Sequence, residues 1–440
     1  MSYSGRHVLV LGLARSGRAA LELLSRAGAV VSAYDRSPEA LRDLAAGVEA
    51  LSGPAAPDFA RFDAVVASPG VPLAPHPKLV PEVDLAAEFL DAPLVGVTGS
   101  NGKSTTTVLV GEMLRASGFD TGVGGNLGTA LCALVGRGHT RIVAELSSFQ
   151  LEHASKLHAD VAVLLNLAPD HLDRHGTLAA YGAAKARLAR LQRPESWLVV
   201  NRDDPWAHAV GKSAPARVLE FSTEERLASG ACLDGKDVVL VRDGGIALRV
   251  PQGALSAAAR RPVANALAAA LAASLAGAGP DAIRAALERF EGLPHRVRDV
   301  CVRGGVRYVD DSKATNPAAA VASLLAQTVP VVWLAGGRNK GLDFAPLADA
   351  ARRAGVRAAI VYGESAADLE RALARACAVA RVETLAEAVT RAAVSARPGD
   401  VVLLAPACAS FDQFKSFEDR GRRFAELAQA LPDAAGGGAC

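Results

Sequence analysis

Aromatic residues, excess charge of either sign and long apolar runs are all scarce in this sequence. Aromatic side chains make up only 5% of its 440 residues, while alanine and glycine dominate many stretches. This composition favours helices packed closely on parallel sheets over a β-sandwich. Its 48 basic residues nearly balance 46 acidic ones, so the formal charge of +2 predicts no strong attraction to nucleic acid or to an anionic membrane.

Apolar runs such as Ala266–Ala276 fall short of the ~20 residues that a membrane-spanning helix needs. The chain enters a strand pattern by His7 without a basic and apolar leader. The six cysteines are Cys132, Cys232, Cys301, Cys377, Cys408 and Cys440. They form no CxxC pair and no metal-binding spacing, so we expect a reduced protein of the cytoplasm.

Apolar runs that alternate with helical stretches predict three α/β domains in series, at residues 1–92, 93–292 and 293–440. Asp91-Ala92-Pro93 is typical of a linker. The predicted strands are His7–Leu11, Ala29–Tyr34, Ala64–Ala67, Leu94–Val97, Arg141–Glu145, Val161–Asn166 and Trp197–Asn201, short segments within Val218–Val250, and runs ending at Asp310, Ala335, Tyr362 and Ala405. The predicted helices include Gly17–Ala27, Ala264–Ala276, Pro317–Leu325 and Leu385–Ser395.

A glycine-rich loop lies between a predicted strand and a predicted helix. It reads Thr98-Gly99-Ser100-Asn101-Gly102-Lys103-Ser104-Thr105. Glycines allow backbone N–H groups to face phosphates, Lys103 neutralises them, and Ser104 offers a hydroxyl to Mg²⁺. Val97 occupies the first glycine position of GxxxxGK[ST], so the fragment is better described as TGxxGKST. A purely structural turn is the weaker alternative, and we interpret the loop as a nucleotide-binding loop.

Carboxylate and imidazole side chains follow two later apolar runs. Glu145 ends one of them and is suited either to bind Mg²⁺ or to form a strand-end salt bridge. After the other, His171 is suited to bind a metal with Asp170 holding it, but satisfied side chains at a helix N-terminus are an equal alternative. Lys185 lies in a helical stretch, and nothing in its local sequence distinguishes it.

The first predicted turn is similar to a dinucleotide-binding pattern. Gly12-Leu-Ala14-Arg-Ser16-Gly17 matches GxGxxG except at Ala14, and Asp35 follows 18 residues after Gly17. These residues alone allow an NAD(P)-dependent oxidoreductase, and the later loop allows an NTPase that hydrolyses ATP without ligation. Cys408 invites a nucleophile assignment, but a small buried thiol is the favoured interpretation.

Several motifs together resemble the Mur ligases, in the same order and over nearly the whole chain from Gly12 to Phe424. They are TGSNGKST, ELSSFQLE, DHLDRH, PHR, DDSKATNP and PACASFDQFKSFEDRGRRF. The second and the last are most similar to the branch that joins D-glutamate to UDP-N-acetylmuramoyl-L-alanine. Another amino-acid-adding Mur ligase and a folylpolyglutamate synthase are the related alternatives.

The resemblance implies an α/β fold with a Rossmann-like UDP-binding domain, a central P-loop ATPase-type domain and a Rossmann-like C-terminal domain. It also implies an ATP-dependent amide-bond ligase of peptidoglycan precursor synthesis. We expect this ligase to act in the cytoplasm as a monomer on small-molecule substrates, without a nucleic-acid or membrane partner. In this chemistry ATP phosphorylates the carboxylate of the UDP-linked substrate, and the amino group of D-glutamate attacks the acyl phosphate and releases phosphate.

Residue roles follow by motif from the same resemblance. Lys103, Glu145, His171 and Lys185 are the implied catalytic residues. ATP would be bound by Gly99, Ser100, Asn101, Gly102, Lys103, Ser104, Thr105, Asn265, Arg296 and Asp311. Two Mg²⁺ ions are implied, with ligands Ser104, Glu145, His171 and Lys185 in carbamylated form. The UDP-substrate would be bound by Ser16, Asp35, Arg36, Ser68, Pro69, Gly70 and Asn126, and D-glutamate by Lys313, Thr315, Lys340, Ser410 and Phe417.

Some of these roles have structural alternatives, and two positions depart from the family pattern. Helix capping by Thr315 and Asn316 is as good an interpretation as glutamate binding when the fragment stands alone. Asn339 replaces an acid, and Arg261-Pro262 replaces His-Asn ahead of Asn265. These departures affect the expected adenine recognition rather than the activity.

We predict that Lys103→Ala abolishes ATP-dependent turnover while leaving the UDP-substrate site intact, because the substitution removes the cation that neutralises the phosphates. Phosphate release from ATP measures this effect. Unchanged ATP-dependent activity in the variant would contradict the assignment of the phosphate loop.

Overall fold

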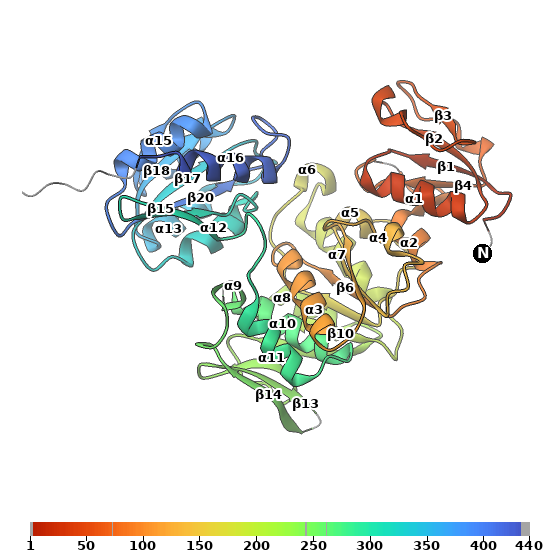
Figure 1. Ribbon diagram of the computed structural model, residues 1–440, viewed down its shortest axis with the longest axis horizontal. Helices are drawn as coiled ribbons and strands as arrows, with labels where there is room; N and C mark the ends of the chain where they lie inside the picture. The colour runs from red at the N-terminus through yellow and green to blue at the C-terminus, as the bar shows by residue number, and fades with distance from the viewer. Residues whose placement is uncertain (1–2, 73, 243, 261, 433–440) are drawn as a thin grey trace, which may run out of the picture. The chain divides into compact units, whose positions relative to one another are not determined.

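The computed structural model describes residues 3–72, 74–242, 244–260 and 262–432. Arg261 and Cys440 lie outside the described residues. The chain forms two compact units (Figure 1). The first comprises Met1–Leu167 and Ala179–Phe290, and the second comprises Ala168–Leu178 and Glu291–Cys440. No helix among the described residues has both the length and the apolar character needed to cross a membrane.

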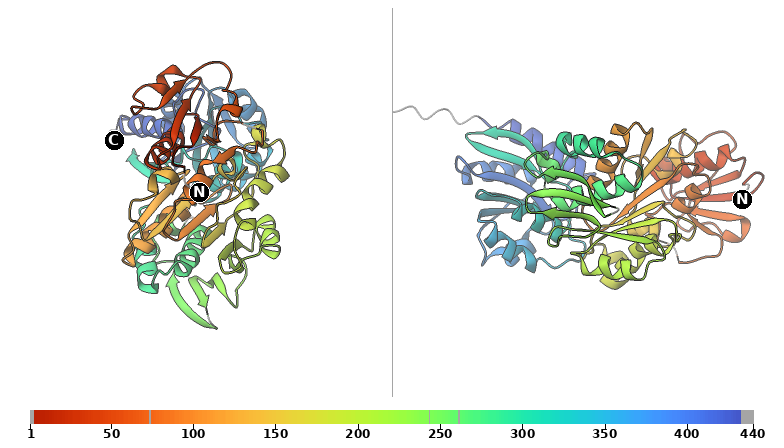
Figure 2. Two further views of the ribbon diagram at one scale, coloured as in Figure 1. Left: turned by 90° about the vertical axis from the view of Figure 1, so that its right-hand side faces the viewer. Right: turned by 90° about the horizontal axis from the view of Figure 1, so that it is seen from below.

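The first unit begins with a parallel sheet whose described strands have the order β3-β2-β1-β4-β5. Its strands are β1 (His7–Leu11), β2 (Val30–Tyr34), β3 (Glu49–Leu51), β4 (Ala64–Ala67) and β5 (Leu79–Pro81). Its helices are α1 (Arg15–Arg26), α2 (Glu82–Ala87) and the 3₁₀ turns η1 (Pro38–Leu41) and η2 (Phe59–Arg61). The strands lie side by side in both views of Figure 2. The sequence analysis missed the short edge strands β3 and β5. Pro81 ends β5, and proline is tolerated at a sheet edge because an outer N–H has no ladder partner.

A second sheet in the same unit has the order β14-β13-β12-β11-β10-β9-β6-β8-β7 over the described residues. Its strands are β6 (Leu94–Thr98), β7 (Thr121–Gly125), β8 (Arg141–Glu145), β9 (Val161–Leu164), β10 (Trp197–Asn201), β11 (Arg217–Ser222), β12 (Gly230–Asp234), β13 (Asp237–Arg242) and β14 (Gly245–Pro251). Its helices are α3 (Lys103–Ala116), α4 (Leu131–Leu134), α5 (Ser148–Leu151), α7 (Leu178–Arg190), α8 (Pro205–Lys212), α9 (Ala257–Arg260), α10 (Val263–Leu275) and α11 (Pro280–Arg289). β12, β13 and β14 pair antiparallel, whereas the other neighbouring strands pair parallel.

The second unit contains a sheet with the order β15-β16-β20-β17-β18-β19 in the described part of the chain. Its strands are β15 (Arg298–Arg303), β16 (Val306–Asp310), β17 (Val331–Gly336), β18 (Val356–Tyr362), β19 (Ala378–Arg381) and β20 (Val401–Ala407). Its helices are α6 (Leu172–His175), α12 (Pro317–Leu325), α13 (Ala345–Arg353), α14 (Ala366–Leu373), α15 (Leu385–Ser395) and α16 (Phe417–Gln429). β15 and β16 pair antiparallel across Gly304-Gly305, a dipeptide typical of hairpin turns that the sequence analysis did not use.

Most predicted strands are confirmed, but several ends differ. β9 ends at Leu164 rather than Asn166, because the backbone beyond it turns toward the glycine-rich loop, where Ser100 N donates to Asn166 O at 2.9 Å. β17 ends at Gly336 and β20 at Ala407, so each is slightly longer than predicted. The antiparallel strands β12, β13 and β14 lie where short strands within Val218–Val250 were predicted, whereas the antiparallel β15 was not predicted.

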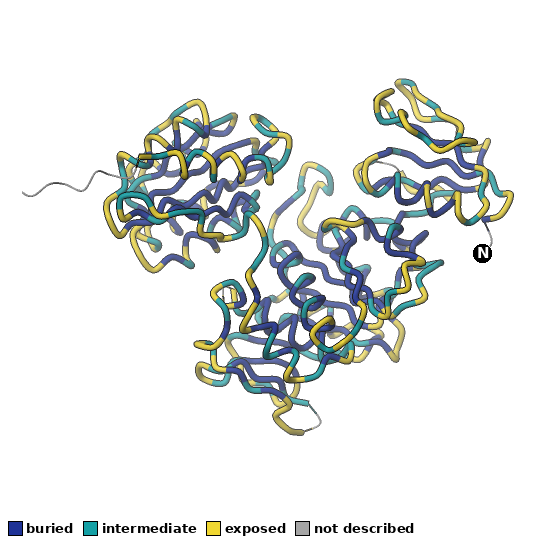
Figure 3. Tube along the Cα trace, in the orientation of Figure 1, coloured by how far each residue is buried: buried dark blue, intermediate teal, exposed yellow. Residues whose placement is uncertain are grey.

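Alanine allows the close helix packing that the composition predicts. α10 packs on α3 and crosses several strands of the second sheet. All residues from Ala266 to Ala273 on this helix are fully buried. The tube of Figure 3 shows the same pattern, with buried strands in dark blue and exposed loops in yellow. Small side chains therefore let a helix lie deep within the first unit.

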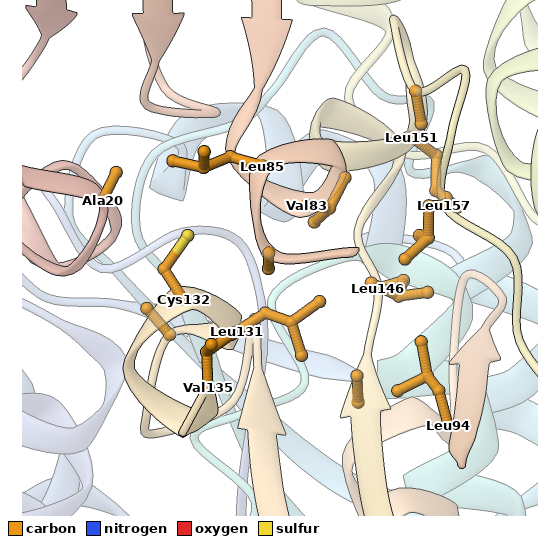
Figure 4. Close-up of a cluster of buried hydrophobic side chains, with 14 of the residues drawn as sticks. Ala20, Val83, Leu85, Leu94, Leu131, Cys132, Val135, Leu146, Leu151 and Leu157 are labelled. Atoms are coloured by element: carbon orange, nitrogen blue, oxygen red, sulfur yellow. The ribbon is translucent and has the colours of Figure 1, made fainter. Parts of the chain in front are cut away.

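Apolar side chains of α1, α2 and α4 join the two sheets of the first unit in one hydrophobic cluster. Figure 4 shows Val83 and Leu85 of α2 close to Leu131 and Cys132 of α4. Ala20 of α1 belongs to the same cluster. Since apolar burial is the main favourable contribution to folding, this cluster holds the two sheets of the first unit together.

We predict that Leu131→Ala lowers the free energy of unfolding of the first unit by about 2–5 kcal/mol, because Leu131 is fully buried and its loss leaves a cavity. Urea denaturation measures the change. Val30→Ala is the control, because Val30 of the same unit is 53% exposed and should change stability by no more than about 0.5 kcal/mol. Equal effects of the two substitutions would contradict the packing of this cluster.

Candidate active site

The glycine-rich loop connects β6 to the N-terminus of α3. Gly102 has a φ of 84°, and a side chain there would collide with Asn265 Oδ1 of α10. Only glycine satisfies both conditions without strain. Gly102 is the N-cap residue of α3 and has no side chain with which to cap the helix. The backbone N–H groups of such a helix end bind anions, and phosphate is their common ligand.

Two lysine side chains bind the backbone of this loop. Lys103 Nζ donates to Gly99 O and Ser100 O, at 2.9 Å each. Lys185 Nζ donates to the same Gly99 O at 2.7 Å and lies 4.6 Å from the centre of the Tyr181 ring. Lys185 is only 1% exposed, which is unusual for lysine. The structure therefore brings Lys103 and Lys185 together, although local sequence did not distinguish Lys185.

Asn166 holds the loop from the neighbouring strand. Its side-chain Oδ1 accepts from Asn101 N at 2.9 Å, and its Nδ2 donates to Asn101 O at 3.1 Å. Asn166 was not among the predicted site residues. Its place directly after a buried parallel strand was the available signal, because functional groups gather at the carboxyl ends of such strands.

Glu145 is the last residue of β8, the strand that pairs with β6, and it is 2% exposed. Its Oε1 accepts from Asn126 Nδ2 at 2.7 Å, and its backbone O accepts from Asn126 N at 2.8 Å. Arg15 Nη2 donates to Asn126 O at 3.2 Å. Asn126, predicted from the resemblance to contact the UDP-linked substrate, is therefore directly joined to the carboxylate predicted to bind metal.

The oxygen atoms in this part of the first unit suit Mg²⁺. Ser104 and Glu145 are both buried and offer a hydroxyl and a carboxylate. No group of three or more His, Cys, Asp or Glu side chains in the described part of the chain could hold a metal by itself. Mg²⁺ does not require such a cage, since it commonly uses one or two carboxylates together with phosphate and water. The residues present fit Mg²⁺ that is bound together with a nucleotide.

The first sheet carries a second loop suited to an anion, at the N-terminus of α1. Gly17 packs so closely on Gly12 O that a side chain would collide with it. Ser68 Oγ donates to Gly12 O at 2.6 Å, and Asp35 Oδ2 accepts from Leu13 N at 2.7 Å. Asp35 thus supports this loop. Ser16 and Pro69 are half-buried, whereas Arg36 and Gly70 are exposed.

In the second unit, Asp170 is the centre of a polar cluster. Its Oδ2 accepts from Asn316 Nδ2 at 2.9 Å, and its Oδ1 accepts from Lys340 Nζ at 3.1 Å. His171 Nε2 lies 3.7 Å from Asp170 Oδ2. Burial acts to raise the pKa of Asp170, but Lys340 and His171 outweigh it and lower the pKa below its ordinary value. Of the predicted metal ligands, His171 lies in this unit, whereas Ser104, Glu145 and Lys185 lie in the first.

Two consecutive aspartates lie at the carboxyl end of β16, and they have different surroundings. Asp310 Oδ2 lies 2.6 Å from His295 Nδ1, and its Oδ1 accepts from Ser312 N at 2.8 Å. Asp311 accepts a hydrogen bond from Ser323 Oγ and is 5% exposed. Burial raises the pKa of Asp311 to about 6, opposed by Ser323 and by the charge of Arg296. Arg296 Nε is buried without a hydrogen-bond partner among the described residues.

A fully buried arginine holds the carboxyl ends of three strands of this sheet. Arg420 of α16 donates to Ser312 O at 2.8 Å, to Cys408 O at 3.1 Å and to Gly336 O at 3.4 Å. Sequence analysis quoted this arginine within a motif but assigned it no role. Lys313 Nζ lies 3.8 Å from the centre of the Phe417 ring. Phe417 is half-buried rather than part of the core, and Ser410 is buried.

The structure explains three of the sequence alternatives. Asn316 caps α12, with its Oδ1 accepting from Ala319 N at 2.8 Å, so the capping interpretation is confirmed for Asn316. Asn339 both donates to Leu342 O and accepts from Leu342 N, at 2.9 Å each, whereas an ionised acid could only accept. Cys408 is 1% exposed, and burial raises the pKa of its thiol to about 12, which confirms a structural thiol.

Comparison with known proteins agrees with this geometry. The Mur ligase middle domain matches residues 97–273, and the Mur ligase glutamate ligase domain matches residues 295–408. A UDP-N-acetylmuramoylalanine–D-glutamate ligase of Pelotomaculum thermopropionicum is 41% identical over 450 residues, covering 98% of each chain. The ligase of the same name from Myxococcus xanthus is 43% identical over 98% of this chain and 100% of its own.

The chain belongs to the Mur ligase family. As a Mur ligase it is an enzyme that forms a carbon–nitrogen bond, which excludes the oxidoreductase and the hydrolysing NTPase as its principal activity. The solved MurF ligase of Thermotoga maritima in complex with ADP is 19% identical, with a TM-score of 0.61 over 97% of this chain and 94% of its own. This likeness confirms the multidomain α/β fold of a Mur ligase.

The surroundings of Asp311 predict a dependence of stability on pH. Its pKa of about 6 in the fold exceeds the ordinary ~3.9, so the folded state keeps the proton to higher pH. The stabilising contribution of the protonated Asp311 is complete below about pH 4 and is lost as the pH rises through about 6. Relative to Asp311→Asn, the wild-type protein should therefore lose about 3 kcal/mol of unfolding free energy across this window.

Urea denaturation of the second unit between pH 4 and pH 8 measures this difference. Asp299→Asn, at an exposed position of the same unit, controls for removal of a carboxylate. A stability difference between wild type and Asp311→Asn that stays constant with pH would contradict the burial of an ionisable Asp311.

Proposed function

We propose that this Mur ligase joins D-glutamate to UDP-N-acetylmuramoyl-L-alanine, with conversion of ATP to ADP and phosphate, in cytoplasmic peptidoglycan precursor synthesis. The observation that carries the proposal is the phosphate loop, on which Lys103 and Lys185 both bind Gly99 O. The identity of the substrates is inferred from the relatives, since ligases named for D-glutamate match 98% of this chain. The other amino-acid-adding ligases are the alternatives that the experiment below separates.

The proposed chemistry has two steps. The L-alanine carboxylate attacks the γ-phosphorus of ATP, which forms an acyl phosphate and releases ADP. The neutral amine of D-glutamate then attacks the acyl carbon, and the tetrahedral intermediate expels phosphate to leave the amide. Phosphorylation is required because a free carboxylate is a poor acyl donor, whereas phosphate is a good leaving group.

The first step needs positive charge around the transferred phosphoryl group. The N–H groups at Gly99–Ser104 and the ammonium of Lys103 supply it, and Thr105 and Asn265 complete the ATP site. Support comes from Thr105 Oγ1, which is buried without a hydrogen-bond partner among the described residues. Lys103 bonds to the loop carbonyls in this structure, and the phosphates would give it a stronger, charged acceptor.

We further propose two Mg²⁺ ions, one held by Ser104 and Glu145 and the other by Glu145, His171 and a carbamylated Lys185. When bound, these ions supply charge neutralisation for the phosphates. Carbamylation would convert the buried Lys185 from a cation into an anionic oxygen ligand, whose buried charge a bound Mg²⁺ would balance. Asn126 would orient Glu145 through the hydrogen bond already present at 2.7 Å.

The remaining site residues bind the other groups in this proposal. Residues 1–92 hold the UDP group, with Ser16, Ser68 and the Pro69-Gly70 turn at the diphosphate and Asp35-Arg36 near the uridine. Residues 293–440 receive D-glutamate through Lys313, Thr315, Lys340, Ser410 and Phe417, because a dicarboxylate needs cations and hydrogen-bond donors. Arg296 and Asp311 contact the nucleotide, and residues 93–292 carry the phosphate loop. We propose that the enzyme acts as a monomer.

Phosphate release from ATP tests the proposal when UDP-N-acetylmuramoyl-L-alanine is supplied with D-glutamate, L-glutamate, meso-diaminopimelate or no acceptor. We expect release to require D-glutamate, together with the corresponding mass gain on the UDP-substrate. Release with meso-diaminopimelate alone would assign another step to this ligase. Release that is independent of any acceptor would overturn the proposed ligation.

A further inference from the structure

The short helix α2 directs acidic side chains toward elements of the second sheet, although α2 follows directly on β5 of the first. Glu82 Oε1 accepts from Cys132 N, in the first turn of α4, at 2.9 Å. Glu88, just after α2, pairs with Lys156 Nζ through its Oε1 at 2.5 Å. Between them lies Asp84, which is 1% exposed. None of these residues belongs to the nucleotide, metal or amino-acid sites described above.

Asp84 makes the densest set of hydrogen bonds in this contact. Its Oδ2 accepts from Ser155 N at 2.7 Å and from Ser155 Oγ at 2.9 Å. Its Oδ1 accepts from Lys156 N at 3.1 Å and from Leu157 N at 2.9 Å. One carboxylate thus receives four donors from three consecutive residues, more than seventy positions away along the chain. Hydrogen bonds to an ionised acceptor are the stronger kind, and their geometry is directional.

The apolar contacts around Asp84 define the orientation of α2 less well than its four hydrogen bonds do. Val83 and Leu85 pack among Leu131, Leu151 and Leu157, as Figure 4 shows. Hydrophobic burial is non-directional, so such a surface tolerates small shifts of α2 against the elements of the second sheet. Four hydrogen bonds to one carboxylate do not tolerate them, because each requires its own distance and angle.

The position of this contact along the chain links it to both loops at the helix N-termini. α2 leads through a short connection into β6, which ends at Thr98 directly before Gly99. Ser155–Leu157 leads into β9, which runs beside β6 and is followed by Asn166, the residue that brackets the phosphate loop. On its other side α2 packs against α1, whose N-terminus carries the Gly12–Gly17 loop.

We propose that Asp84 is a positioning residue that sets the UDP-substrate loop relative to the phosphate loop. This inference rests on the proposed function, in which the carboxylate of the UDP-linked substrate must meet the γ-phosphate of ATP. A displacement of about 1 Å between reacting groups can reduce a rate about 100-fold even when both ligands still bind. Asp84 therefore acts on the rate of carboxylate phosphorylation and not on the affinity for either ligand.

A graded pair of substitutions tests this role. Asp84→Asn keeps one oxygen acceptor but places an amide N–H₂ group against the remaining donors, whereas Ser155→Ala removes only the Oγ donor. Asp91→Asn is the matched control, since Asp91 is exposed in the connection between α2 and β6. We expect kcat for D-glutamate-dependent phosphate release to fall at least about tenfold in Asp84→Asn, less in Ser155→Ala, and not in Asp91→Asn.

The dissociation constants of ADP and of the UDP-substrate, each measured alone by calorimetry, should stay within about threefold of wild type in Asp84→Asn. A fall in kcat with both affinities retained supports positioning. An unchanged kcat overturns it, and so does a parallel loss of both affinities, because that would show a general loss of folding.

Hydrogen exchange provides a readout that is independent of ligation. In Asp84→Asn, the amides of Ser155, Lys156 and Leu157 should exchange at least about tenfold faster than in wild type, while those of α3 remain unchanged. Unchanged exchange at these three amides would overturn the positioning role of Asp84, whichever amino acid the enzyme ligates. Failure of the wild-type protein to use D-glutamate would instead overturn the proposed function and leave this exchange result to decide the contact.

Discussion

The backbone carbonyl of Gly99 is the point on which the rest of the candidate site depends. Lys103 from the start of α3 and Lys185 from α7 both donate to it. The carbonyl lies beside the N-terminus of α3, where the Lys103 ammonium and the backbone dipole both favour an anion. The conformation of the loop that presents this carbonyl requires glycine at position 102, because Asn265 fills the space that a side chain would occupy. Loop geometry, lysine placement and the buried asparagine are thus mutually dependent.

The three sheets share the position of their candidate site residues. In each, residues of the candidate site follow the carboxyl end of a parallel strand: Gly12 after β1, Gly99 after β6 and Asp311 after β16. Crossover helices cover the faces of these sheets, so the strand ends are where loops can vary without disturbing the core. The antiparallel additions, β12–β14 and β15, lie at sheet edges and lengthen the sheets.

Sequence reasoning identified most of the individual groups but few of their partners. The phosphate loop, Glu145 and the Asp170-His171 pair could be recognised because each follows a buried run at a strand end. Lys185 could not, since a lysine in a helix is ordinarily solvated. A helical signal did exist, because Tyr181, Lys185 and Leu188 are spaced to share one face of α7 and all three are buried. Asn339 shows the converse case, where a departure from a motif is explained only by its reciprocal bonds to Leu342.

The sequence by itself determined the α/β class, the order of most strands and helices, the nucleotide loop and the resemblance to Mur ligases. These features are local or periodic, so apolar alternation, glycine placement and motif order express them directly. The tertiary structure alone decided that Lys185 is buried against Gly99, that Asn126 binds Glu145, that Arg420 joins three strand ends and that Asp84 receives four donors from Ser155–Leu157. Each of these contacts joins residues far apart in the chain, and only the packing of strands and helices brings them within hydrogen-bond distance.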